Sequence, residues 1–169
     1  VSGYVYPIGQ HAGRSLLFGV RYMNLAFLQP FVENIAKNIQ GRCFGNIHLH
    51  GPFKALNVEG DAFVLDGGLG IEYLNTYYTF SDSIHLTPGA IIGRNVTVHD
   101  KFGNSAKVNL TVNHKHFKDV SFDVGVQTNN MLVFDAPQKQ NPLIFGTVFG
   151  TGTASIKGNG QLINFDINM

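Results

Sequence analysis

Residues 105–113 read Ser-Ala-Lys-Val-Asn-Leu-Thr-Val-Asn, and apolar and polar side chains alternate along the whole stretch. Residues 119–127 repeat the pattern, because every second residue from Val120 to Val126 is apolar. Successive side chains of a β-strand point to opposite faces, so a period of two predicts strands with one dry and one wet face. The same period continues along most of the chain, which predicts an all-β protein.

Turn-forming residues separate these runs at short intervals. Gly and Asn tolerate a positive φ angle, which tight hairpin turns require. Short connections between consecutive strands predict an antiparallel meander of about eleven or twelve strands. The expected turns are at Asp66-Gly67-Gly68, Pro88-Gly89, Gly103-Asn104, Asn129-Asn130, Asn141-Pro142 and Gly158-Asn159-Gly160.

One segment departs from the period of two. Apolar residues between Leu28 and Ile39 recur at three- and four-residue steps, the spacing of an amphipathic helix. Pro30 suits a first helical turn and Gly41 suits a helix end. These signals predict one short helix over residues 29–39, and residues 14–27 before it read equally well as a strand or as more of the same helix.

The number of strands constrains the overall shape. Twelve neighbouring strands at about 4.8 Å would form a sheet about 55 Å wide, and open twisted sheets rarely exceed about ten strands without curling or splitting. One helix of about 16 Å cannot cover the dry face of such a sheet. The apolar face is therefore expected to fold against itself as a sandwich, a closed barrel or a U-shaped trough.

Composition excludes several classes of function. The 169-residue chain has a net charge of +1 and only 14% charged residues, so it offers no basic field for nucleic acid. Its single cysteine, Cys43, excludes an internal disulfide framework. No signal peptide is visible, and the first residue is Val1, so we expect a segment of a longer protein.

No arrangement of side chains predicts catalysis. His48 and His50 lie two apart on one strand face, as do His114 and His116, a spacing that suits one metal ion. The nearest carboxylate, Glu59, falls on a different predicted strand, so these histidines read mainly as solvated side chains, less as a partner-binding patch, and least as metal ligands. The acidic residues mostly flank turns, and neither a nucleophile elbow nor a phosphate-binding loop is present. We therefore expect no enzyme activity, no metal and no cofactor.

A series of glycine- and aspartate-containing motifs follows in order along the chain: Gly45-Asn-Ile-His-Leu-His-Gly51 through Gly60, Asp100–Gly103, His114–Phe117, the strand after Asp119, Phe145-Gly146 and Thr151–Gly158. Taken together, these motifs resemble the C-terminal conserved domain of the TamB family (translocation and assembly module B), which belongs to the AsmA-like bridge proteins. The resemblance covers about residues 41–169. It implies a β-groove domain over 41–169, with residues 1–40 as a strand and amphipathic helix leading into the same structural unit.

The resemblance also implies a function without enzyme chemistry. The family's sheet is curled like a taco around a continuous hydrophobic groove. The family is anchored in the inner membrane, spans the periplasm of Gram-negative bacteria, carries phospholipid, and assists outer-membrane proteins together with a barrel assembly partner of the TamA/Omp85 type. In this chain the expected groove residues are Val58, Ile71, Phe80, Val108, Leu110, Val112, Val120, Phe122, Val124, Val126, Ile163, Phe165 and Ile167.

Two other structures stay open on the sequence alone. A structural or adhesive β-sandwich would close the dry face with side chains and refuse hydrophobic dyes. A small outer-membrane barrel would instead turn its apolar residues outward.

Overall fold

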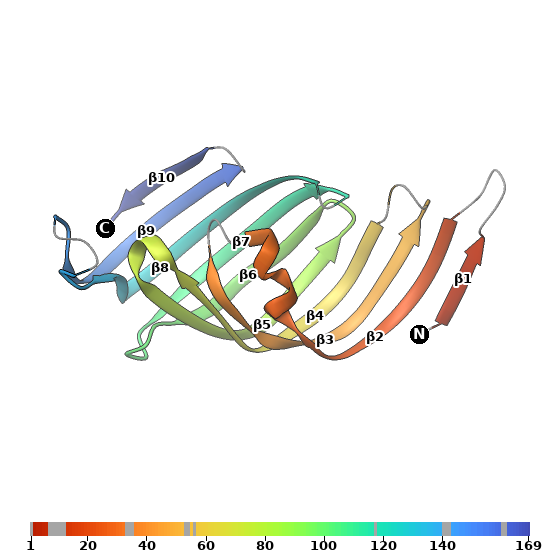
Figure 1. The fold of residues 1–169 in the computed structure, drawn as a ribbon, viewed down its shortest axis with the longest axis horizontal. Coiled ribbons are helices and arrows are strands. Elements are labelled where there is room, and N and C mark those ends of the chain that lie inside the picture. Colours follow the sequence, from red (N-terminus) through yellow and green to blue (C-terminus); the bar gives the residue numbers. More distant parts are fainter. Residues whose placement is uncertain are drawn as a thin grey trace.

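The described part of the chain forms one antiparallel sheet of ten strands that follow each other in sequence order (Figure 1). The computed structural model describes residues 2–6, 13–32, 36–52, 55, 57–116, 118–139, 143–159 and 162–169. The strands are β1 (Ser2–Tyr6), β2 (Gly13–Asn24), β3 (Lys37–Gly51), β4 (Asn57–Ile71), β5 (Thr76–Thr87), β6 (Ala90–His99), β7 (Ser105–Lys115), β8 (Lys118–Ala136), β9 (Gly146–Asn159) and β10 (Ile163–Asn168). The predicted all-β meander is confirmed.

The sheet is curled, and β-bulges contribute to the curl. Asp66, Asn95 and Asn130 have positive φ angles of 51°, 52° and 59°, and each lies where the pairing register shifts. In each case the backbone N–H of the bulged residue is accepted by a side-chain oxygen on the next strand. The acceptors are Ser81, Asn109 and Thr151, at 3.0, 2.9 and 2.9 Å. A bulge bends its strand and increases the local twist, so this repeated device curves the sheet.

The bulges also correct the predicted number of strands. Asp66-Gly67-Gly68 and Asn129-Asn130 were predicted to be turns, but they lie inside β4 and β8, which run through them. The same positive φ that closes a hairpin also makes a bulge, so long strands were divided in two. The turns at Pro88-Gly89 and Gly103-Asn104 are confirmed. Gly158 and Asn159 end β9, whereas Gly160 and Asn141-Pro142 lie outside the described residues.

The predicted helix over residues 29–39 is wrong at its C-terminal end. A 3-10 helix, η1 (Leu25–Leu28), leads into a single helical turn, α1 (Gln29–Val32), and β3 has begun by Lys37. The Gln29 side chain donates to the Ala36 carbonyl and accepts from the Ile39 N–H, at 2.9 and 3.0 Å. The Ala36 carbonyl and the Ile39 N–H, which a longer helix would have used in its own hydrogen bonds, are thus bonded to the Gln29 side chain. Residues 33–35 lie outside the described residues.

A second 3-10 helix, η2 (Glu72–Leu74), joins β4 to β5. No helix in the described part of the chain combines the length and the apolar character needed to cross a bilayer.

The buried core is small because the sheet forms a single layer. In Figure 1 the helical segment lies in the hollow of the curled sheet. Leu25 of η1 packs there with Cys43, Ala62 and Val64. No second sheet covers the described residues, so a sandwich is not formed. The chain exposes 10961 Å², whereas a compact monomer of this mass exposes about 8,200 Å².

Candidate functional site

Strand register places the predicted groove residues of β7 to β10 on one face. Residues directly opposite each other in antiparallel strands share a face. Three rows of opposed residues cross these four strands. The rows are Val112–Phe122–Gly158–Ile163, Leu110–Val124–Ile156–Phe165 and Val108–Val126–Ala154–Ile167. Val120 lies on the same face, because it is two residues before Phe122.

The remaining predicted residues extend this face across β4 to β6. Val108 is opposite Val96, and Val98, two residues further along β6, is opposite Phe80 of β5. Phe80 is opposite Gly67, which shares its face with Ile71 of β4. Val58 shares a face with Val64, because they are an even number of positions apart. The bulge between Val64 and Gly67 adds one residue, so Val64 and Gly67 lie on the same face, and Val58 lies there too. All thirteen predicted positions therefore lie on one side of the sheet, the side that carries the helical segment.

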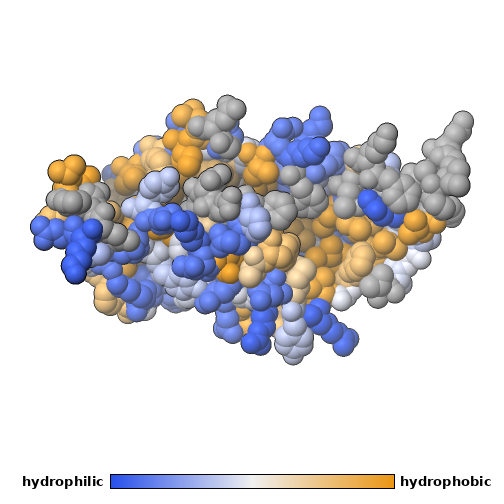
Figure 2. Space-filling model, viewed as in Figure 1, coloured by the Kyte–Doolittle hydropathy of each residue, from blue (hydrophilic) through white to orange (hydrophobic). Residues whose placement is uncertain are grey.

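Coverage divides this apolar face into two regions. The covered region lies under η1, where Cys43 and Val64 are only 2% exposed. Burial raises the pKa of the Cys43 thiol, as expected for a cysteine that acts as a small apolar side chain. The open region consists of the three rows on β7 to β10. Its six central side chains on β7 and β8 are half-buried, and Phe165 and Ile167 are 63% and 61% exposed. Figure 2 shows apolar surface around β9 and β10 and, separately, over the β2–β3 side of the molecule.

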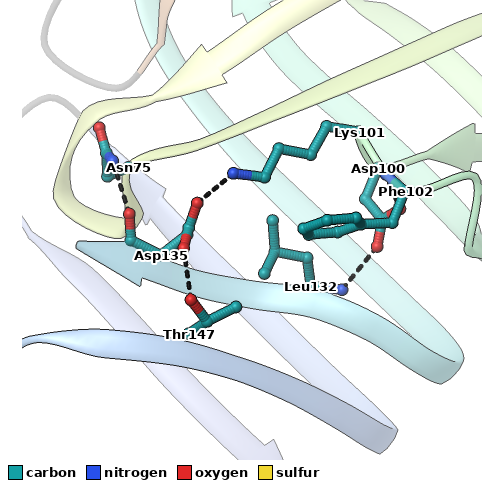
Figure 3. A network of polar contacts seen from close by, with 7 residues as sticks. All are labelled: Asn75, Asp100, Lys101, Phe102, Leu132, Asp135 and Thr147. Atoms are coloured by element: carbon teal, nitrogen blue, oxygen red, sulfur yellow. Dashed lines mark hydrogen bonds and ion pairs between the residues drawn. The ribbon is translucent and has the colours of Figure 1, made fainter. Parts of the chain in front are cut away.

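One end of the trough is closed by contacts between strands that are not neighbours. The β6–β7 hairpin turns at Asp100–Asn104, whereas β5 and β8 run past it on either side. The Tyr78 hydroxyl of β5 donates to the Leu132 carbonyl of β8 at 2.9 Å. Asn75 donates to the Asp135 carbonyl, which joins the β4–β5 turn to β8 (Figure 3). We call the residues that hold this end together the end clasp. They are Asn75, Tyr78, Asp100, Lys101, Leu132, Asp135 and Thr147.

Asp100 is the buried carboxylate of the end clasp. It accepts four hydrogen bonds at 2.8–2.9 Å, from the backbone N–H groups of Phe102, Asn104 and Leu132 and from the Asn104 amide. Burial alone would raise the pKa of Asp100, but these hydrogen bonds outweigh it and hold the pKa below its ordinary value. The carboxylate therefore stays ionised and binds the β6–β7 turn to β8.

Asp135 is the second carboxylate of the clasp, and it pairs with Lys101 and accepts from the Thr147 hydroxyl at 2.7 Å (Figure 3). The hydrogen bond from Lys101 is the main reason that the pKa of Asp135 is lowered. A hollow of about 420 Å³ lies beside Asp135 and Phe145, away from the apolar rows. Both carboxylates are thus committed to structural contacts.

The groove contains residues that the sequence analysis did not select. Leu16, Phe18 and Val20 of β2 lie on the same face, because the first two are opposite Leu49 and Ile47 of β3. Residues 14–27 are so evenly apolar that their alternation was hidden, although the pairing with β3 would have revealed it. Ile91 and Ile156 also belong to the face, since they are opposite Val112 and Val124.

His48 and His50 lie on the opposite, outer face of β3 and take no part in the groove. The second predicted pair does not share a strand, since His114 is in β7 and His116 is in the turn after it. Phe117, the end of the His114–Phe117 motif, lies outside the described residues.

No family model, curated protein or solved structure matches this chain. The geometry of the groove and the sequence motifs are therefore the features that bear on function.

Proposed function

We propose that this chain is a β-groove module of an envelope-bridge protein similar to the C-terminal domain of TamB. Its groove shelters phospholipid acyl chains, or the apolar strands of outer-membrane protein clients, on their way between the two membranes. The observation that carries the proposal is the open region, three apolar rows on β7 to β10 that no other part of the described chain covers. Monomeric soluble proteins rarely expose a continuous apolar patch without a partner for it.

The chemistry of the open region suits a ligand without fixed polar groups. Its rows contain only aliphatic side chains, Phe, Ala and Gly. Burying an alkyl chain is favourable by about 0.8 kcal/mol per CH₂ wherever the chain lies along an apolar surface. Such a surface binds an acyl chain at many positions with similar affinity, which is what a conduit requires.

An exposed sheet edge supports the protein-client form of the proposal. Within the part of the chain that the structure describes, β10 pairs only with β9, and all six of its residues are exposed. An unpaired edge offers backbone donors and acceptors to an incoming strand, while the adjacent apolar row receives its side chains. In this proposal the full-length protein is anchored in the inner membrane, reaches through the periplasm, and delivers its cargo to a TamA/Omp85-type partner.

The first test is mass spectrometry of lipid that co-purifies with the chain. We expect phospholipid to remain bound after detergent-free purification from Gram-negative cells. A photocrosslinking amino acid placed at Leu110 or Phe122 is expected to capture lipid or client protein. Matched probes at Asn113 and Ser121, which belong to the same two strands and point to the outer face, are expected to capture neither.

Absence of lipid, together with no crosslink from Leu110 or Phe122, would refute transport by this groove. Equal crosslinking from the inner and outer positions would show non-specific adsorption and would also count against the proposal. A hydrophobic dye distinguishes the closed-core alternative, since a sealed core leaves the dye dark and an open groove makes it fluoresce in the native state.

A further inference from the structure

Three metal-ligating side chains converge on the outer face of the sheet, away from the groove. His48 of β3 is directly opposite Glu59 of β4, and His50 lies two residues along the same face. Glu59 is far from the histidines in sequence, but the β3–β4 hairpin places it beside them. The ligand atoms of these three residues all lie within 4.8 Å of one another.

The distances approach those of a tetrahedral metal site. Glu59 Oε1 lies 3.0 Å from His48 Nδ1 and 3.3 Å from His50 Nε2. Zinc binds imidazole nitrogen and carboxylate oxygen at about 2.0–2.1 Å, so neighbouring ligands around a tetrahedral ion stand about 3.3 Å apart. Because both histidines lie on one side of the sheet, their imidazole rings stack with centroids 4.6 Å apart.

Two further contacts favour a ligand between these side chains. His48 Nε2 lies 2.8 Å from the Ser15 hydroxyl, which orients the ring and leaves Nδ1 facing Glu59. Metal-bound histidines commonly make such a contact through their second nitrogen. His50 Nε2 is shielded from solvent and has no hydrogen-bond partner among the described residues, although Glu59 is near. A shielded polar nitrogen without a partner carries a desolvation cost that a bound ion would remove.

We propose that His48, His50 and Glu59 bind one borderline divalent metal ion, with Zn²⁺ as the best match to a set of two imidazoles and one carboxylate. The fourth position is open to water, since the three side chains are each 28–43% exposed. The ion clamps β3 to β4 on the outer face. The site does not depend on the proposed transport function, because its ligands point away from the groove.

The test is calorimetric titration of Zn²⁺ into the untagged chain. We expect one equivalent to bind, with affinity reduced at least tenfold in Glu59→Gln and in His50→Gln. Ser15→Ala leaves all three ligands in place and is expected to lower the affinity by about tenfold through loss of ring orientation. The control is the double variant His114→Gln/His116→Gln, which removes as many imidazoles elsewhere and is expected to bind Zn²⁺ like the parent chain.

A second readout keeps the test independent of folding defects in a variant. Co²⁺ added to the unmodified chain is expected to give the visible absorption of a four-coordinate site, and Zn²⁺ is expected to displace it. Zn²⁺ is also expected to raise the melting temperature of the parent but not of Glu59→Gln. Equal Zn²⁺ affinity in the parent and in Glu59→Gln, or a loss of affinity confined to the His114/His116 variant, would overturn the proposal.

Discussion

The covered and open regions of the apolar face are built from the same alternating pattern but have different environments. Under η1, Val64 is buried among Leu25, Cys43 and Ala62. In the three rows on β7 to β10, side chains of the same kind are half-buried or exposed. The difference arises because one short helical segment lies over β3 to β5, whereas nothing in the described chain lies over the three apolar rows of β7 to β10. Burial in the first region therefore stabilises the fold, whereas the second leaves apolar surface available to a ligand.

The largest expected difference comes from placing a charge in each region. Val64→Asp leaves an unpaired carboxylate in the core and is expected to lower the free energy of unfolding by about 4 kcal/mol or more. Val124→Asp in the open region can hydrate its charge and is expected to cost about 1 kcal/mol or less. Urea denaturation of both variants measures the difference. Equal losses would mean that the open region is packed as tightly as the covered one.

The end clasp gives the next largest effect. Asp100→Asn loses the carboxylate that accepts four hydrogen bonds and is expected to cost about 1–3 kcal/mol of stability at neutral pH. Tyr78→Phe removes a single hydrogen bond of the same clasp and is expected to cost less, about 1 kcal/mol. A smaller loss for Asp100→Asn than for Tyr78→Phe would contradict the central place of Asp100.

The same carboxylate predicts a pH dependence. Because the folded-state pKa of Asp100 is below its ordinary value of 3.8, its stabilisation is complete above that value and disappears as pH falls through the folded-state pKa. The stability difference between the parent and Asp100→Asn is thus expected to shrink only below about pH 4. Urea midpoints measured across this range check the sign, and a difference that grows on acidification would contradict it.

Polar substitution in the open region is expected to affect ligand binding much more than stability. The double variant Phe122→Asn/Phe165→Asn is expected to reduce dye fluorescence several-fold, while the free energy of unfolding changes by only about 1 kcal/mol. Ser121→Asn, on the outer face beside Phe122, is the matched control and is expected to bind dye like the parent. A dye signal that survives in the double variant would place the binding surface elsewhere.

The smallest effect concerns the bulges. Thr151→Val removes the hydroxyl that accepts the Asn130 N–H and is expected to cost about 0.5–1 kcal/mol, since the contact is exposed. Thr153→Val, two residues along β9 and also exposed, is expected to change stability less. Thermal denaturation of the two variants compares them directly.

Local pattern predicted the strands well and their limits less well. The alternation in residues 105–127 depends on the period of a strand alone, so it placed every groove residue of β7 and β8 on one face. Asp66 and Asn130 were misinterpreted because a bulge and a turn make the same backbone demand. The helix over 29–39 was extended too far because its apolar spacing carries no information about the pairing of Lys37 with Gly70 across β3 and β4.

Contacts set by strand register differ in predictability from contacts set by the curvature of the sheet. His48 lies opposite Glu59 because β3 and β4 form a hairpin, in which residues equally far from the connection face each other. This pairing can be derived from the sequence once the position of the connection is assumed. The bond between Asn75 and Asp135 joins residues 60 positions apart and exists only because the sheet curls. No local pattern carries that information.

The strictly sequential order of the strands has a consequence for how such a protein grows and folds. Apart from the end clasp, nearly every strand contacts only the strands before and after it, so the sheet resembles a stack of repeats coupled to their nearest neighbours. Duplicating a hairpin would lengthen the sheet without changing the pairing of the other strands. Assembly can likewise spread outward from any well-formed hairpin, since each new strand closes only a short loop.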